Sequence, residues 1–252
     1  MYKDLPRPTI FAHRGAKAYA PENTLASFQM AVTQGAPAIE LDAKLTADGE
    51  VVVFHDLTLD RTSNGTGPLN KQTLAALKEL DAGSHFSSEF RGEKIPTLGE
   101  VFESVGQQVF INVELTNYAS RKDELPDKVV SLVQQFGLQN RVMFSSFNRF
   151  ALQHAHQLMP EIPLGLLALP GIFGAPARSW IGRKWIAYQA LHPASMDAKP
   201  RLIQDAHQRG QRVHVYTVNL RQEMIRLFKA GVDGIFTDDP LLAISVLKQI
   251  GK

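Results

Sequence analysis

The sequence predicts an α/β protein whose fold is a closed (β/α)8 TIM barrel. Eight apolar runs rich in β-branched residues recur along the chain, and helix-compatible segments separate them. The length of 252 residues matches the roughly 250 residues that are typical of one such barrel. We therefore expect a single domain over residues 1–252, with a doubly wound open sheet as the structural alternative.

The expected strands alternate with amphipathic helices. Segments such as NTLASFQMAVTQG and RQEMIRLFKAG carry apolar residues at three- and four-residue spacing and close on glycine, as helices do. One interval is too long for a single helix and is rich in turn formers, so we expect a small inserted subdomain after the second strand, at about 57–107. The expected strands cover residues 9–13, 38–45, 109–115, 142–147, 163–169, 187–192, 212–218 and 234–237.

Composition excludes several functional classes. The chain has no cysteine, which excludes disulfides, thiolate metal sites and cysteine nucleophiles. A net charge of +2 with interspersed charges gives no broad electropositive surface for nucleic acid. The first residues lack the apolar core of a signal peptide, and no run approaches the roughly 18 apolar residues of a spanning helix. We expect a cytoplasmic protein without stable membrane anchoring, and nothing in the sequence predicts its oligomeric state.

Ionisable residues lie at the ends of the apolar runs. His13 ends TIFAH, Glu40 and Asp42 lie in AIELDAKL, His55 follows VVVF, and Glu114 lies in FINVEL. A charge at the tip of a buried strand is costly unless it is paired or metal-bound. In barrels of this kind the reactive groups come from the carboxyl ends of the strands. This pattern therefore indicates an enzyme.

The acidic residues predict a site for a hard cation. Glu40 and Asp42 are two residues apart, so their side chains share one face of a strand. Together with Glu114 they offer the oxygen ligands that Mg²⁺ or Ca²⁺ prefers. The alternative is that each carboxylate is paired with a basic side chain such as Arg14 or Lys44.

A hairpin signal bears on the position of His55. Asp48-Gly49 lies between two apolar runs, as in tight turns. A two-residue turn would place His55 opposite Asp42, and a four-residue turn would place it opposite Glu40. A three-residue loop would instead move His55 to the other face.

Longer stretches resemble a known family. HRGAKAYAPENTLASF, ELDAKLTADGEVVVFHD, LDRTSNGTGPL, KIPTLGEVF, INVEL, SSFN, YTVN and GVDGIFTDDP resemble glycerophosphodiester phosphodiesterases and follow the family order along nearly the whole chain. The resemblance implies a (β/α)8 barrel with an inserted subdomain. It also implies hydrolysis of small glycerophosphodiesters, such as glycerophosphocholine, to glycerol 3-phosphate and an alcohol.

The resemblance also assigns roles to individual residues. It makes His13 and His55 the acid and base pair, and Arg14 a phosphate-binding residue. One divalent cation, Mg²⁺ or Ca²⁺, would be held by Glu40, Asp42 and Glu114. By family analogy a glycerol hydroxyl attacks phosphorus and gives a cyclic phosphate that water opens. We assign His13 as the base and His55 as the acid of the first step, although the sequence does not fix this direction.

Two positions depart from the family pattern. Thr116 stands where many members carry a lysine two residues after the third carboxylate, so one positive charge is missing there. Tyr216 stands at a common tryptophan position, where it keeps an aromatic wall and adds a hydroxyl that can bond substrate. The paired aspartates in GVDGIFTDDP resemble turn and helix-start residues more than ligands.

Related activities are the alternatives. Lysophospholipase D and phospholipase C-like phosphodiesterases also act at a phosphodiester beside a hydroxyl-bearing group. A noncatalytic phosphate-binding barrel is an explanation of a different class. For that class we would expect one of the histidines or carboxylates to be replaced, and none is.

Overall fold

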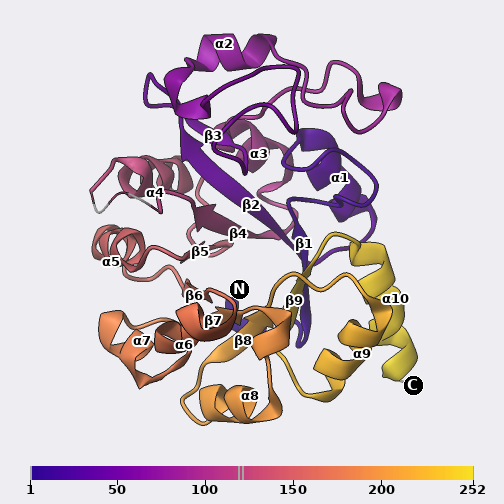
Figure 1. The fold of residues 1–252 in the computed structure, drawn as a ribbon, viewed down its shortest axis with the longest axis vertical. Coiled ribbons are helices and arrows are strands. Elements are labelled where there is room, and N and C mark those ends of the chain that lie inside the picture. Colours follow the sequence, from indigo (N-terminus) through magenta and orange to yellow (C-terminus); the bar gives the residue numbers. More distant parts are fainter. Residues whose placement is uncertain (1, 119, 121, 252) are drawn as a thin grey trace.

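The computed structural model describes residues 2–118, 120 and 122–251 and has the predicted barrel architecture (Figure 1). Eight parallel strands form a ring, and it closes because β1 pairs with both β2 and β9. This closure confirms the (β/α)8 fold and excludes the open sheet. The barrel strands are β1 (Thr9–His13), β2 (Ala38–Leu45), β4 (Phe110–Leu115), β5 (Val142–Ser146), β6 (Leu164–Ala168), β7 (Ala190–Pro193), β8 (Arg212–Val215) and β9 (Gly234–Thr237).

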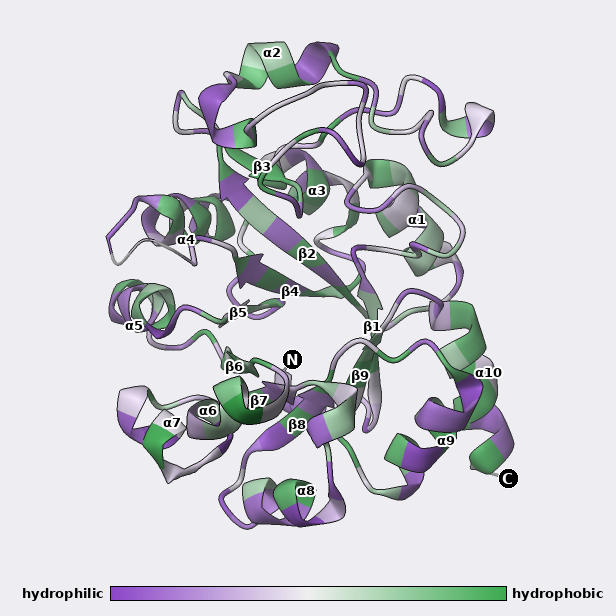
Figure 2. Ribbon diagram, in the orientation of Figure 1, coloured by the Kyte–Doolittle hydropathy of each residue, from purple (hydrophilic) through white to green (hydrophobic). Residues whose placement is uncertain are grey.

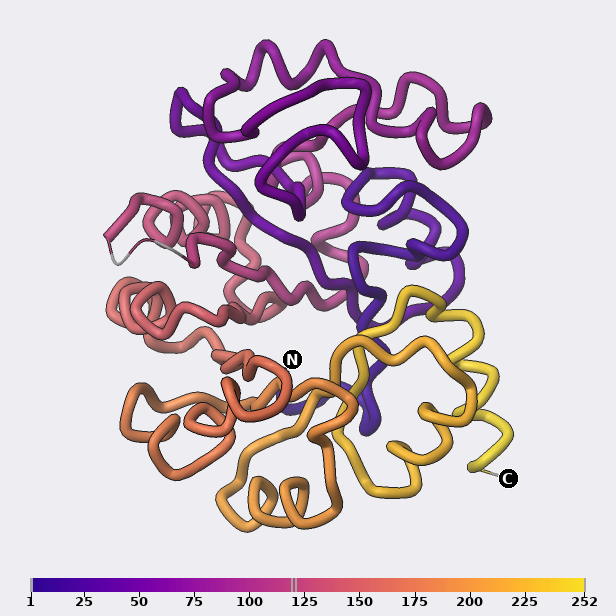
Figure 3. The backbone as a smooth tube through the Cα atoms, viewed as in Figure 1, coloured from indigo at the N-terminus to yellow at the C-terminus, as the bar shows by residue number. Residues whose placement is uncertain are grey.

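Helices surround this ring, and the chain passes around it in sequence order (Figure 3). The last helix, α10, therefore packs beside the first strand, β1. The surrounding helices are α1 (Leu25–Thr33), α3 (Leu98–Val105), α4 (Leu125–Gln135), α5 (Arg149–Leu158), α6 (Ala175–Arg178), α7 (Trp180–Trp185), α8 (Pro200–His207), α9 (Arg221–Lys229) and α10 (Pro240–Ile250). Short 3-10 helices are η1 (Tyr2–Asp4), η4 (Gly171–Gly174) and η5 (Ser195–Asp197).

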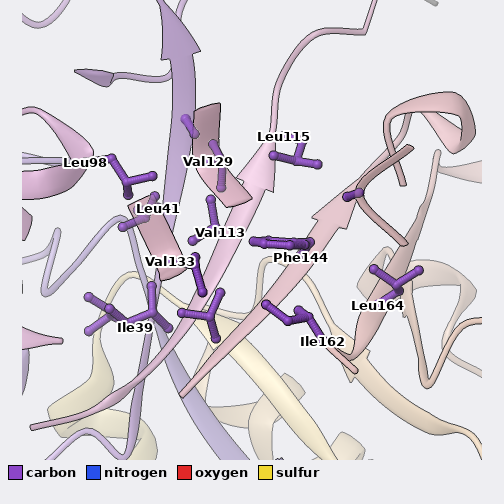
Figure 4. Close-up of a cluster of buried hydrophobic side chains, with 14 of the residues drawn as sticks. Ile39, Leu41, Leu98, Val113, Leu115, Val129, Val133, Phe144, Ile162 and Leu164 are labelled. Carbon is purple, nitrogen blue, oxygen red and sulfur yellow. The ribbon is translucent and has the colours of Figure 1, made fainter. Parts of the chain in front are cut away.

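The apolar core lies between the strands and the helices. Hydrophilic and hydrophobic residues alternate along β2 (Figure 2). Ile39 and Leu41 of β2 are buried in one cluster with Val129 and Val133 of α4 (Figure 4). Because side chains alternate across a strand, Glu40 and Asp42 point to the opposite side, into the barrel. The packing that builds the core thus also aims the carboxylates inward.

The hairpin after β2 has the register of a three-residue loop, the third of the turn lengths considered from the sequence. β3 (Val51–Val53) pairs antiparallel with β2, with Val53 opposite Ala43. The Thr46 amide donates to the Glu50 carbonyl at 3.0 Å, which leaves a three-residue loop at 47–49. The registers of a two-residue and of a four-residue turn are therefore wrong. The chain leaves the sheet after Val53, so His55 is positioned by a loop and not by strand pairing.

The segment after β3 packs around a small apolar cluster of its own. It contains η2 (Leu69–Lys71), α2 (Leu74–Glu79) and η3 (Ser88–Phe90), and α2 lies outside the ring at the top of Figure 1. Leu59, Leu69, Leu77 and Ile95 form the cluster together with side chains of the β3 region. By contrast, α3 packs in the main core between α1 and α4. The bounds of the inserted subdomain, at about 57–107, stay a prediction.

No helix within the described part of the chain is long and apolar enough to cross a membrane.

Candidate active site

A polar pocket of 240 Å³ lies at the carboxyl ends of the barrel strands. Strand pairing explains why its residues meet, because His13 is in register with Glu40 across β1 and β2. Asp42 is likewise in register with Glu114 across β2 and β4. The pocket brings together most of the site residues that the sequence predicts, since its lining includes His13, Arg14, Glu40, His55, Glu114 and Tyr216.

Three carboxylates form the acidic centre of this site. One oxygen from each of Glu40, Asp42 and Glu114 lies within 4.8 Å of the other two. Burial raises the pKa of Glu40 well above its usual value, and the charges of Asp42 and Glu114 raise it further. Burial and the charge of Asp42 raise the pKa of Glu114 to about 8. Without an added positive charge, these neighbours therefore resist being ionised together.

Asp42 differs from its two neighbours because cations and donors surround it. Burial raises its pKa, but the positive charge of Arg14 and the interaction with His55 hold the pKa below the usual value. Asn23 also donates a hydrogen bond from Nδ2 to Asp42 Oδ2 at 2.9 Å. Asp42 is therefore the carboxylate of this cluster whose ionised form the protein itself stabilises.

Arg14 is held in place by its backbone as well as its side chain. Its φ is 58°, in the left-handed region, and its amide donates to Glu40 Oε2 at 2.9 Å. Gly15 follows with φ 85°, and a Cβ there would lie 2.3 Å from Ser27 Oγ, so only glycine fits this close approach. The strained turn therefore places the Arg14 guanidinium at the acidic cluster.

The guanidinium of Arg14 is engaged by carboxylates. Nη1 donates to Glu22 Oε1 at 2.9 Å, and Nε lies 3.2 Å from Asp42 Oδ2 without hydrogen-bond alignment. Burial opposes its charge, but Asp42, Glu40 and Glu22 raise its pKa above the ordinary value. Arg14 thus pairs with Asp42, as in the alternative that a basic side chain pairs with each carboxylate. Among the described residues, Glu114 has no cationic side chain within 4 Å, and Glu40 has only His13.

His13 has a carboxylate partner that the sequence did not reveal. Its Nδ1 lies 2.6 Å from Asp238 Oδ1, while Nε2 is 4.0 Å from Glu40 Oε2. Burial lowers the pKa of His13, and the hydrogen bond to Asp238 opposes that effect. Asp239 instead accepts a hydrogen bond from the Leu242 amide and caps α10. Asp239 is therefore the expected helix-start residue, whereas Asp238 is the partner of His13.

His55 has a similar arrangement in the loop after β3. Its Nδ1 lies 2.6 Å from Asp56 Oδ1, and Arg61 donates to Asp56 and to Glu22. The hydrogen bond from Arg61 lowers the pKa of Asp56 to about 2. Burial raises the pKa of Glu22, yet Arg61 and Arg14 hold it below the usual range. Arg61 thereby links the surroundings of His55 and Arg14, a role that no sequence pattern indicated.

The residues at this site fit a divalent cation. Glu40 Oε1 is buried and has no hydrogen-bond partner in the described part of the chain, so one ligand oxygen is free. Its neighbours Asp42 and Glu114 supply further carboxylate oxygens at chelating separation. Three anionic oxygens of this kind suit Mg²⁺ or Ca²⁺ better than softer metals.

A lysine on the neighbouring strand lies beside Thr116. Lys44 Nζ donates to Thr116 Oγ1 at 2.9 Å, and Thr116 in turn donates to the Ala43 carbonyl. Lys44 is two residues after Asp42, so its side chain shares the face of the carboxylates. An ammonium group thus occupies the space beside Thr116, supplied from β2 instead of β4.

Tyr216 lines the pocket as a wall residue. Its hydroxyl donates to the Ala168 carbonyl at 2.7 Å, and its ring meets Phe147 edge to face at 6.0 Å. The hydroxyl proton is therefore already used within the protein, which leaves the ring and, as an acceptor, the hydroxyl oxygen for a ligand.

Two other histidines lie in the barrel interior, where His192 lines the floor of the pocket and His214 is behind it. His192 Nε2 is 3.2 Å from His214 Nδ1, and both rings are fully buried beside Phe236. Burial lowers the pKa of His192 to about 3 and that of His214 well below its usual value. These uncharged rings fill the barrel interior and carry no carboxylate partner among the described residues.

A barrel mouth that joins two buried carboxylates and the half-buried Glu114 to two histidines is typical of an enzyme active site. Residues 13–242 match the Glycerophosphoryl diester phosphodiesterase family. Glycerophosphodiester phosphodiesterases from Caldanaerobacter subterraneus subsp. tengcongensis and Bacillus altitudinis are 38% and 36% identical, and each alignment covers 96% of this chain and 98% of the relative. This chain therefore belongs to that family and is an enzyme.

A solved structure agrees with this assignment. The Oleispira antarctica phosphodiesterase in complex with the product sn-glycerol-3-phosphate is 35% identical, with a TM-score of 0.88 and 98% of each chain covered. The glycerophosphodiester phosphodiesterase of Agrobacterium tumefaciens is 30% identical with a TM-score of 0.81, covering 94% of this chain and 99% of its own.

Proposed function

We propose that the enzyme hydrolyses glycerophosphodiesters to glycerol 3-phosphate and an alcohol by histidine acid-base catalysis. The observation that carries this proposal is the pairing of His13 with Asp238 and of His55 with Asp56 beside one acidic cluster. In each pair the carboxylate engages Nδ1, so Nε2 is free for proton transfer in the pocket. The product in the Oleispira relative supports the same substrate class.

We further propose that Glu40, Asp42 and Glu114 hold one divalent cation, Mg²⁺ or Ca²⁺. When bound, such an ion neutralises anionic phosphate oxygens and the mutual repulsion of the three carboxylates. Arg14, next to Asp42, supplies a permanent positive charge that helps to orient the phosphate. Tyr216 provides the aromatic wall against which the substrate lies.

The reaction proceeds in two steps through a cyclic phosphate. In the first step, a glycerol hydroxyl gives its proton to His13 and attacks phosphorus. The bond from phosphorus to the leaving alcohol breaks, and that alcohol takes a proton from His55. In the second step, His55 takes a proton from water, which attacks phosphorus, and the opened ring oxygen takes the proton from His13. Both histidines thus return to their starting states.

The surroundings of His55 support its role as the acid of the first step. Leu57 and Thr58 follow it closely and line a second, larger cavity on that side of the pocket. A leaving alcohol directed toward this cavity would depart beside His55. His13 ends β1 directly before the turn that carries Arg14, where we place the glycerol phosphate part.

Release of glycerol 3-phosphate from glycerophosphocholine tests the proposed function. The purified enzyme is assayed as prepared, after EDTA, and after Mg²⁺ or Ca²⁺ is restored. We expect EDTA to abolish turnover and one of the two ions to restore it. Turnover that EDTA leaves unchanged contradicts the metal site. Release of lysophosphatidic acid from lysophosphatidylcholine without any glycerol 3-phosphate from glycerophosphocholine would instead assign lysophospholipase D activity.

A further inference from the structure

A second cavity of 660 Å³ adjoins the catalytic pocket. It lies between the segment after β3, the segment around η2 and the loop that follows β4. Tyr118 lines both spaces, and its hydroxyl donates to Glu114 of the acidic cluster. The two spaces therefore meet at a residue that touches a proposed metal ligand.

The sizes of the two spaces indicate that a substrate extends from one into the other. Small-molecule sites in proteins usually measure about 300 to 1,000 Å³. The catalytic pocket, at 240 Å³, is below this range, whereas the adjoining cavity, at 660 Å³, is within it. The catalytic pocket therefore suits the glycerol phosphate part, and the larger cavity suits the other half of the diester.

The walls of the larger cavity are mainly apolar. Leu57 is 76% exposed at its edge, although a leucine there gains nothing from contact with water. Aliphatic side chains from three separate segments contribute further apolar surface to this wall, namely Leu45, Pro68, Leu69 and Leu125. An apolar ligand would cover Leu57 and remove this surface from water.

Two charged residues, Lys44 and Asp123, lie in the wall of the larger cavity. Lys44 is 8% exposed, and its ammonium has one hydrogen bond, to Thr116, and no carboxylate within 4 Å among the described residues. Asp123 also lines the cavity, and its Oδ1 accepts hydrogen bonds from the Asn117 side chain and the Leu125 amide, which hold this carboxylate against its own loop. Lys44 presents an ammonium to this cavity that no carboxylate pairs within 4 Å among the described residues, and this charge opposes a cationic ligand beside it.

We propose that this cavity binds the alcohol part of the substrate and selects alcohols with an apolar, uncharged body over cationic ones such as choline. This inference rests on the proposed function and names its preferred substrate class. The ammonium of Lys44 repels a quaternary ammonium group, and the leucine walls bind a hydrocarbon chain.

A series of glycerophosphoryl esters tests the proposal. We compare kcat/KM for the methyl, butyl and hexyl esters and for glycerophosphocholine in the metal-loaded enzyme. Each methylene that enters an apolar site contributes about two- to fourfold. We therefore expect the hexyl ester to exceed the methyl ester by about thirtyfold or more, and to exceed glycerophosphocholine as well.

Variants locate the effect in this cavity. Leu57→Ser should lower kcat/KM for the hexyl ester by about three- to tenfold and that for the methyl ester by less than twofold. Leu158→Ser, at an exposed leucine ending α5 and outside both cavities, is the matched control and should change neither. Lys44→Met should raise the ratio of kcat/KM for glycerophosphocholine to that for the hexyl ester.

The outcomes separate this inference from the proposed function. If glycerophosphocholine and the methyl ester are hydrolysed but the hexyl ester gains no advantage, the cavity does not bind the alcohol and the inference is wrong. Equal losses for all esters in Leu57→Ser, or an unchanged ratio in Lys44→Met, also overturn it. If none of the esters yields glycerol 3-phosphate, the proposed function itself fails.

Discussion

Two pairs of histidines in this barrel have opposite environments. His13 and His55 lie at the mouth, and each has a carboxylate 2.6 Å from Nδ1. His192 and His214 lie on β7 and β8 in the interior, where they bond to each other and pack against aromatic rings. The same side chain thus has the carboxylate partner that we propose supports proton transfer at the mouth, and it serves packing in the interior.

A catalytic histidine of this barrel therefore needs both a carboxylate partner and a position at the carboxyl ends of the strands. His207 also bonds a carboxylate, with Nε2 2.7 Å from Asp233, but it ends α8 and Asp233 precedes β9. These residues lie at the amino ends of the strands, away from the site. A carboxylate partner raises the basicity of an imidazole wherever it occurs, yet only at the carboxyl ends of the strands can that imidazole meet the substrate.

Removal of the mouth histidines should have the largest effect. His13→Ala and His55→Ala should each lower kcat by about 10² to 10⁴, the range for loss of a general acid or base. His214→Asn, the matched variant at a buried histidine outside the pocket lining, should lower stability and retain activity within about tenfold. Glycerol 3-phosphate release and circular dichroism measure both properties. Near-native turnover by either mouth variant would reject its assigned role.

Replacement of Asp238, the carboxylate that bonds His13, should lower activity less than replacement of His13 itself. Asp238→Asn keeps the size of the side chain but removes the charge that orients His13, so we expect kcat to fall by about 10- to 100-fold. Asp239→Asn is the control, because the neighbouring side chain caps α10. Its activity should be unchanged, and its free energy of unfolding should fall by at most about 1 kcal/mol. Equal kinetics in the two variants would show that Asp238 does not position His13.

The buried pair of His192 and His214 should make the free energy of unfolding depend on pH. The pKa of His192 is about 3 in the folded state and about 6.5 in an unfolded chain. Below pH 6.5 the unfolded state therefore binds a proton that the folded state does not, and the free energy of unfolding falls as the pH falls. Between pH 6.5 and 5 this group should account for about 2 kcal/mol.

Urea unfolding at several pH values measures this difference. The loss of stability on acidification should be smaller in His192→Asn than in the wild type, because the variant lacks the titrating ring. Parallel curves for the two proteins between pH 7.5 and 5 would mean that His192 is not held uncharged.

Much of the fold follows from periodicity alone. Three of the expected strands, 9–13, 38–45 and 234–237, have the same bounds in the structure, because each is a short apolar run with clear turn signals beside it. Other boundaries differ where residues outside the sheet are also apolar. The expected strand at 187–192 begins only at Ala190, since Ile186 and Tyr188 are buried by packing on the barrel core without joining the sheet.

The positions of the three carboxylates could be predicted from the sequence, but the residues that bond the two histidines and their neighbours could not. Glu40, Asp42 and Glu114 lie in regular strands, so the two-residue alternation gives their direction. Asp238 bonds His13 across 225 positions of sequence, and only closure of the ring between β1 and β9 brings them together. Arg61 lies in an irregular segment, where no periodicity gives a direction. The three-residue hairpin loop likewise depends on local hydrogen bonds that composition does not reveal.

Calorimetric titration with Mg²⁺ and Ca²⁺ tests most directly whether the mouth of the barrel is a metal-dependent catalytic site. We predict that the wild type binds one ion per chain and that Glu114→Gln, which keeps an acceptor for Tyr118, weakens binding at least tenfold. Asp127→Asn, at an exposed carboxylate on α4, should bind like the wild type. Saturable binding that is equally strong in Glu114→Gln, or no binding by the wild type, would contradict the account.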